Sequence, residues 1–232
     1  MTPNAGDSHP LGHKSLLSDA SVRQLPPAML PAEGLPVRIP VVVSMRHAHL
    51  TAAIIEQLFC DRYRLHPSGA VLPGQKFATL ETVDLIGPQG RLRKVQVIGP
   101  PLAMNQIEIS RADALILGIR APVRESGDLI GTPGLTVQGP RSQVALGTGV
   151  ICALRHVHMN PGQAMYLGLK DRDRVEVATQ GCNRRLRFQD VLVRVAPHFS
   201  LELHLDTDDA NAAGVRTGDF ALLTRCICEA PR

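Results

Sequence analysis

An internal duplication is the feature that most constrains how this chain can fold. A pentapeptide, RHAHL at residues 46–50, recurs as RHVHM at 155–159, and each copy directly follows a run of apolar residues. A second pair of landmarks follows, IEI at 107–109 and LHL at 203–205, although the second copy is 13 residues shorter between its landmarks. The 232 residues therefore predict two related units of about 100 residues each.

Short β-rich segments separated by Gly and Pro dominate the chain from residue 37 onward, a pattern typical of β-barrels and β-sandwiches. The expected strands are 39–45, 81–86, 93–98, 106–110, 135–138, 149–154, 174–178, 187–195 and 200–205. The expected helices are 51–60, 113–117, 161–167 and 208–213. We expect a mainly β protein with small capping helices, in which the first unit spans 37–148 and the second spans 149–225.

Residues 1–36 and 226–232 lie outside these two units. Six prolines divide residues 1–36 and bracket a segment at 15–25 whose leucines and alanine share part of one helical face. One interpretation is a flexible, disordered leader. The other is a short amphipathic docking helix on a tether, which buries its apolar face only against a partner. Both place the leader outside the folded core, and residues 226–232 form a tail.

Composition excludes several classes of function. The formal charge is +4, but 21 of the 25 basic residues are Arg and they do not form long runs, so a nucleic-acid surface is not expected. Only 3% of residues are aromatic, which argues against a stacking platform for single strands. No apolar run is long enough to span a membrane. Five cysteines without a C-x-x-C pair favour a cytosolic protein with free thiols.

Metal-ligating residues recur at equivalent positions in the two units. Because side chains alternate along a strand, His-x-His places both imidazoles on one face, where they can chelate one metal. Glu108 and His204 are equivalent in the repeat and lie between aliphatic residues, so each needs a partner. The expected sets are His47, His49 and Glu108, and His156, His158 and His204. Three protein ligands with a fourth position open are typical of catalytic zinc.

The sequence lacks motifs for nucleotide hydrolysis, serine hydrolysis and thermolysin-like proteolysis. Further segments carry a resemblance: IPVVVS at 39–44, PGQKFA at 73–78, QIEISR at 106–111, SGDL at 126–129 and HLDTD at 204–208. With both R-H-x-H blocks in order, residues 37–225 resemble the PduL-type phosphate propanoyltransferases, the phosphotransacylases of propanediol-utilisation microcompartments.

The resemblance implies two β-barrel domains with helical caps, in which the strand before each R-H-x-H block belongs to the other barrel. It implies two zinc ions per chain and transfer of a short acyl group, propanoyl or acetyl, between coenzyme A and inorganic phosphate. It also implies that the leader is an encapsulation peptide. The protein would then lie in the bacterial cytoplasm inside a microcompartment, with shell or cargo proteins as partners, and a homodimer is allowed.

One position departs from the family pattern. Family members usually carry an Arg two residues after the G-P that precedes the T-Q-V-E segment, where it contacts phosphate; here Leu102 stands in its place. Phosphate binding must then use other groups such as Arg46, Arg155 or Arg124, or the substrate differs, or activity is weakened. Loss of a positioned cation commonly costs a few kcal/mol.

The preferred mechanism is direct displacement without an acyl-enzyme. The His47/His49/Glu108 zinc would bind the coenzyme A sulfur and the other zinc would bind phosphate. The remaining expected roles are hydrogen bonds from Ser44 and Asn211, phosphate contacts from Arg46 and Arg155, and coenzyme A contacts from Arg124 and Gln75. Cys152, on an apolar strand, is expected as a core residue.

Two alternatives stay open. A dinuclear zinc hydrolase would use the same ligands to cleave an ester or thioester without phosphate. A non-catalytic scaffold would use zinc for folding and the leader for assembly.

Overall fold

A computed structural model describes residues 35–72, 76–180 and 184–226. The described residues form fifteen strands and four short helices, which confirms the mainly β class. The helices are α1 (Ala52–Leu58), α2 (Arg111–Leu117), α3 (Pro161–Leu167) and α4 (Thr207–Ala213). None of them is long and apolar enough to cross a membrane. The leader interpretation falls on residues 1–34, and the assignment of Gln75 on 73–75, both outside the described residues.

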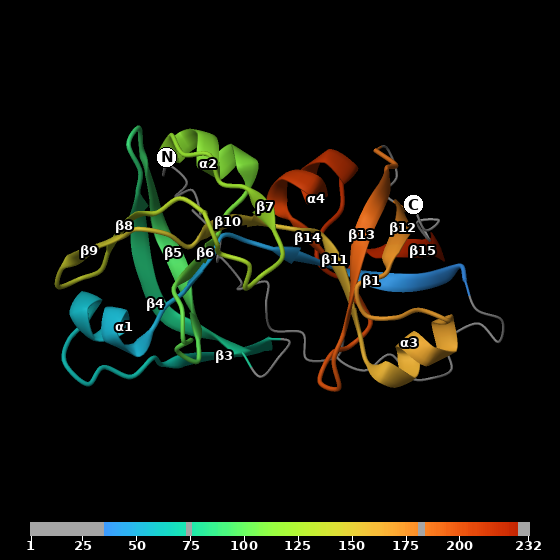
Figure 1. Cartoon of the computed structure of the whole chain (residues 1–232), viewed down its shortest axis with the longest axis horizontal. Helices are drawn as coiled ribbons and strands as arrows, with labels where there is room; N and C mark the ends of the chain where they lie inside the picture. Colours follow the sequence, from blue (N-terminus) through green and yellow to red (C-terminus); the bar gives the residue numbers. More distant parts are fainter. Residues whose placement is uncertain (1–34, 73–75, 181–183, 227–232) are drawn as a thin grey trace, which may run out of the picture.

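The strands form two sheets side by side (Figure 1). One sheet closes into a six-stranded barrel with the order β1 (Val37–Ser44), β14 (Glu202–Asp206), β11 (His156–Met159), β13 (Arg187–Val195), β12 (Arg174–Thr179) and β15 (Phe220–Cys226). The other has nine strands in the order β7 (Val123–Arg124), β10 (Val150–Ala153), β6 (Gln106–Glu108), β2 (His47–His49), β5 (Arg91–Gly99), β4 (Lys76–Ile86), β8 (Leu135–Gln138) and β9 (Gln143–Leu146), with β3 (Pro67–Leu72) paired to β4. Each sheet has its own apolar core.

The two units exchange strands, as the resemblance implies. Strand β1, from the start of the described chain, pairs in parallel with β14 and antiparallel with β15 in the barrel. Strand β10, from the middle of the chain, pairs in parallel with β6 and β7 of the other sheet. The chain therefore leaves one sheet and enters the other just before each R-H-x-H block. The predicted boundary at residue 148 stays a prediction.

The repeat is also visible in the pairing pattern. Strand β2 lies between β5, which is parallel to it, and β6, which is antiparallel; β11 lies in the same way between β13 and β14. The units differ after their first helix. Seventeen residues separate α1 from β4 and include β3, whereas a short turn joins α3 to β12. Most of the additional length of the first unit is in this segment.

Local sequence explains why the helices are short. A polar side chain caps each N-terminus by accepting a backbone N–H: Thr51, Ser110, Asn160 and Asp206. Three helices end at a glycine in the left-handed conformation, with φ of 72° at Gly118, 66° at Gly168 and 65° at Gly214. The caps begin all four helices directly after strands that carry the candidate ligands, and the glycines end three of them after two turns.

Polar contacts join the two units near the middle of the molecule. Helices α2 and α4 lie side by side there (Figure 1), and the backbone N–H of Ala112 donates to the Asp208 carboxylate at 2.9 Å. Glu125 of the first unit also forms ion pairs with Arg172 at 3.0 Å and Arg194 at 3.6 Å of the second unit. The R-H-x-H blocks lie close to this junction because each follows a strand that crosses from one sheet to the other.

Candidate metal centres

The first predicted ligand set is brought together by two neighbouring strands. His47 and His49 lie on β2, and His47 is directly opposite Glu108 on β6. The potential ligand atoms of the three residues lie within 4.8 Å of one another. Nε2 of His47 is 3.6 Å from a carboxylate oxygen of Glu108. His49 and Glu108 are buried, and His47 is partly exposed.

The second set occupies the equivalent place in the barrel. His156 and His158 lie on β11, and His156 is directly opposite His204 on β14. Their potential ligand atoms also lie within 4.8 Å of one another, and His156 is again the most exposed of the three. The rings of His156 and His204 are stacked with centroids 4.9 Å apart. The duplication thus reproduces the strand pairing together with the ligands.

The first histidine of each set is oriented in the same way. Nδ1 of His47 donates to the Met45 carbonyl, and Nδ1 of His156 donates to the Leu154 carbonyl, each at 2.8 Å. Because a carbonyl oxygen only accepts hydrogen bonds, the proton sits on Nδ1 and Nε2 is left as a lone-pair donor. This arrangement of a ring N–H fixed by a backbone carbonyl is common in metal-binding histidines.

Different residues support the remaining ligands. In the first set, Oε1 of Glu108 accepts hydrogen bonds from Gln106 at 2.6 Å and from Ser126 at 3.1 Å. In the second set, a Glu202 carboxylate oxygen is 3.3 Å from Nε2 of His204. The Phe199 ring stacks on His158 with a centroid distance of 3.7 Å.

Burial lowers the pKa values of three of the imidazoles, and neighbouring histidines lower the pKa of the carboxylate. Burial, assisted by the charge of His47, lowers the pKa of His49 to about 3. Burial and His204 lower the pKa of His156 to about 3 and that of His158 further. Burial alone would raise the pKa of Glu108, but His47 and His49 lower it to about 2. At neutral pH His49, His156, His158 and Glu108 therefore offer lone pairs to a metal.

Unpaired nitrogens test whether these residues fit a metal. Among the described residues, Nδ1 of His49 and both ring nitrogens of His158 are buried without a hydrogen-bond partner. An unpaired buried polar atom costs free energy, and coordination of a metal through one nitrogen of each ring would remove part of that cost. A set of three histidines and a set of two histidines and one glutamate both suit zinc.

A basic side chain lies beside the first ligand set. Lys76 begins β4, and its Nζ is 3.4 Å from Nε2 of His49. Burial lowers the pKa of Lys76, and after burial and His47 the Lys76 charge also contributes to the lowered pKa of His49.

The other predicted site residues have the following environments. Arg46 and Arg155 occupy equivalent positions and form equivalent ion pairs, Arg46 with Asp113 at 3.0 Å and Arg155 with Asp209 at 3.2 Å. Both arginines are therefore already paired with carboxylates. Their predicted phosphate contacts stay predictions.

Ser44 ends β1 opposite Asp206, one strand away from the second ligand set. Asn211 lies on α4 with an exposed side chain. Arg124 is paired with Asp128 at 3.8 Å in the exposed part of the loop that holds Ser126. Leu102 lies between β5 and β6, where its N–H donates to the Leu50 carbonyl at 3.0 Å, next to His49.

Five residues near the ligands were not assigned from the sequence. Gln106 and Glu202 each stand two positions before a ligand on the same strand face, so strand alternation could have identified both. Ser126 and Phe199 come from loops, and Lys76 comes from a strand that is distant in sequence. No local pattern connects these last three to the histidines.

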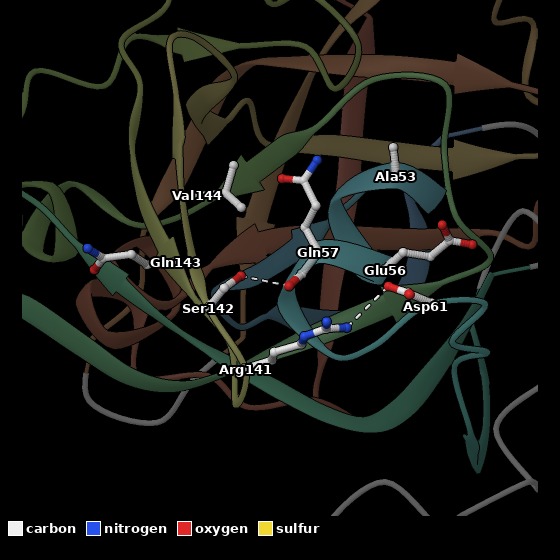
Figure 2. Close-up of a pocket in the computed structure, with 8 residues that line it drawn as sticks. All are labelled: Ala53, Glu56, Gln57, Asp61, Arg141, Ser142, Gln143 and Val144. Atoms are coloured by element: carbon white, nitrogen blue, oxygen red, sulfur yellow. Dashed lines mark hydrogen bonds and ion pairs between the residues drawn. The ribbon is translucent and has the colours of Figure 1, made fainter.

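A hollow elsewhere on the first unit is separate from the ligand sets. It has a volume of about 430 Å³ and lies between α1 and the residues leading into β9 (Figure 2). Arg141 pairs with Asp61 at 3.1 Å across it, and the Ser142 hydroxyl donates to the Gln57 carbonyl at 2.6 Å. The lining residues are Ala53, Glu56, Gln57, Asp61, Arg141, Ser142, Gln143 and Val144, none of which is a predicted site residue.

Comparisons with known proteins identify the family of this chain. The sequence model of the phosphate propanoyltransferase family matches residues 40–216, which include both ligand sets. The phosphate propanoyltransferase of Thermotoga maritima is 48% identical over 183 residues, covering 79% of this chain and 87% of that protein. The enzyme of Klebsiella pneumoniae is 48% identical over 176 residues, covering 76% and 83%. The chain therefore belongs to the phosphate propanoyltransferase family, whose members are acyltransferases.

Proposed function

We propose that this protein is a zinc-dependent phosphotransacylase that moves a propanoyl group between coenzyme A and inorganic phosphate. The observation that carries the proposal is the pair of three-ligand sets at equivalent strand positions. Three ligands leave room for substrate at each metal, whereas four would favour a purely structural role. Family membership supplies the substrates.

The residues of the first set would hold one zinc ion and those of the second set another. Zinc there would act as a Lewis acid that accepts a thiolate sulfur and screens the charge of phosphate. The chain itself holds the ligands of each set together through strand pairing, and burial lowers the pKa values of His49, His156 and His158. Ser44 and Asn211 would donate hydrogen bonds to phosphate or to the reacting carbonyl.

The cysteines of the described residues favour direct attack by phosphate, because neither of them offers an activated thiol for an acyl-enzyme. A phosphate oxygen bonds to the acyl carbon, the carbon–sulfur bond breaks, and coenzyme A leaves as a thiolate. Burial raises the pKa of Cys152 to about 11, so this thiol stays protonated at neutral pH and is a poor nucleophile. The other free cysteine among the described residues, Cys60, is exposed just after the end of α1 and belongs to neither ligand set.

The test combines elemental analysis with product identification. Purified protein should contain two zinc ions per chain, and it should release thiol from propanoyl-CoA only with phosphate present, forming propanoyl phosphate. Thiol release and free propanoate without phosphate would instead identify a hydrolase. Zinc without turnover of propanoyl-CoA or acetyl-CoA would identify a scaffold.

The leader at residues 1–36 is proposed to direct the enzyme into a bacterial microcompartment by binding shell or cargo proteins, with the catalytic region free to form a homodimer. The apolar residues at 15–25 support this proposal, because they would share a helical face. A fluorescent cargo fused to residues 1–36 should enter shells in a shell-forming host. Diffuse cargo would contradict it.

A further inference from the structure

One basic side chain near the two ligand sets has no carboxylate partner. Arg46, Arg155, Arg194 and Arg172 are all within ion-pair distance of an aspartate or glutamate. Lys76, by contrast, forms no ion pair of 4.0 Å or less with any described residue. Its recorded polar neighbour is Nε2 of His49, a neutral ring nitrogen 3.4 Å away. A partly buried ammonium without an anion is costly, and an anionic ligand would offset that cost.

The position of Lys76 relates it to the first ligand set. Its Nζ is 3.4 Å from Nε2 of His49, a residue of that set. An anion bound by Lys76 would therefore also lie near a metal held by the first set.

The strand pairing relates Lys76 to the segment where the family arginine is missing. Phe77, the next residue, pairs with Gly99, and a Cβ at Gly99 would be only 2.5 Å from the Phe77 ring, so the two strands approach closely here. The connection after Gly99 carries Leu102, whose N–H donates to the carbonyl of Leu50, the residue after His49. The start of β4 and the connection that carries Leu102 thus both make contact with the end of β2.

We propose that Lys76 is a substrate-binding residue whose ammonium contacts the inorganic phosphate, in place of the guanidinium absent at Leu102. This inference rests on the proposed function for the identity of the anion. A lysine ammonium acts as a compact point charge with three donors, so it can contact a phosphate oxygen without the bidentate geometry of arginine. Such a contact stabilises bound phosphate and leaves the binding of coenzyme A unaffected.

The experiment uses full-length zinc-loaded protein with Lys76→Gln, Lys76→Arg and the double variant Lys76→Gln/Leu102→Arg. Lys170→Gln is the matched control, because Lys170 is an exposed lysine of the second unit. Lys76→Gln should raise the KM for phosphate about tenfold, equivalent to roughly 1.4 kcal/mol, and change the KM for propanoyl-CoA less than about twofold. Lys76→Arg should retain most of the affinity, and Leu102→Arg in the double variant should restore much of it.

Calorimetric titration with inorganic phosphate separates this inference from the proposed function. Suppose that wild-type protein binds phosphate more tightly than Lys76→Gln does, yet forms no propanoyl phosphate. This result would support phosphate binding by Lys76 and refute the proposed transferase activity. If the protein is active and Lys76→Gln leaves its affinity for phosphate unchanged, the proposed contact between Lys76 and phosphate is refuted. A loss of zinc from Lys76→Gln would also refute it, because the lysine would then act by positioning His49.

Discussion

The two ligand sets lie on equivalent pairs of strands, but a carboxylate occupies a different position in each. In the first unit Glu108 is the ligand and the neutral Gln106, two residues earlier, supports it. In the second unit His204 is the ligand and Glu202, two residues earlier, lies beside it. A carboxylate is therefore a candidate ligand in the first unit. In the second unit the candidate ligands are three histidines, and the carboxylate lies beside one of them. The backbone duplication fixes where ligands stand, and side-chain choice sets the charge of each site.

Replacing one histidine ligand should have the largest effect. His49→Ala should empty only the first site and His158→Ala only the second, so each variant should keep one zinc ion per chain. Either loss should reduce kcat by about a thousandfold, corresponding to roughly 4 kcal/mol of transition-state stabilisation. Zinc per chain and acyl phosphate formation measure the two effects.

His66→Ala is the control for these variants, because His66 is outside both ligand sets. It should retain both zinc ions. If His49→Ala or His158→Ala released both ions, the sites would be mutually dependent and the comparison would fail.

Replacing the residues that support Glu108 and His204 tests whether each support affects zinc affinity only at its own site. Ser126→Ala removes one hydrogen bond to Glu108 and should weaken zinc at the first site by about tenfold. Glu202→Gln removes the charge beside His204 and should weaken zinc only at the second site, by a similar factor. Competition with a zinc chelator measures both. Equal losses at both sites from either variant would show that the supports are not specific.

Part of the two candidate sites could be predicted from the sequence. All six ligands follow from strand alternation and from the repeat, both of which are local in sequence. Ser126 and Lys76 could not be predicted in the same way, because a loop and a strand edge reach the ligands only after distant strands have paired. Strand β3 was also missed, since Pro67 and Gly69 interrupt a β-rich pattern there. The exchange of β1 and β10 rested on family resemblance, because hydrophobic pattern alone does not say which sheet a strand joins.

The equivalent arginine–aspartate pairs provide a smaller test. The Asp113 side chain is 3% exposed and also accepts the Ser110 N–H in a capping box, whereas the Asp209 side chain is 29% exposed. Asp113→Asn should therefore lower the free energy of unfolding by about 2 kcal/mol, and Asp209→Asn by less than about 1 kcal/mol. Urea denaturation measures both, with Asp61→Asn as the exposed control. Equal losses would contradict the difference in burial.

The smallest expected effect concerns the segment found only in the first unit, between α1 and β4. The buried Glu81 carboxylate anchors it by accepting hydrogen bonds from the Tyr63 hydroxyl at 3.0 Å and the His66 backbone N–H at 3.1 Å, and it lies 2.7 Å from Nδ1 of His66. Burial alone would raise the pKa of Glu81, but the contacts with His66 outweigh it and hold that pKa below its ordinary value of 4.5. The folded protein therefore binds fewer protons at Glu81 than the unfolded chain does.

Stability from this anchor should consequently be complete above pH 4.5 and be lost as the pH falls through the lowered pKa of Glu81. Glu81→Gln should lower the free energy of unfolding by about 1 kcal/mol at neutral pH, and the difference from wild type should shrink in acid. Hydrogen exchange should accelerate at residues 59–72 but not at β12, because the second unit has a short turn in place of this segment. Glu56→Gln, an exposed glutamate on α1, is the control. A stability difference that stays constant from neutral pH into acid would show that the Glu81 charge does not hold the segment.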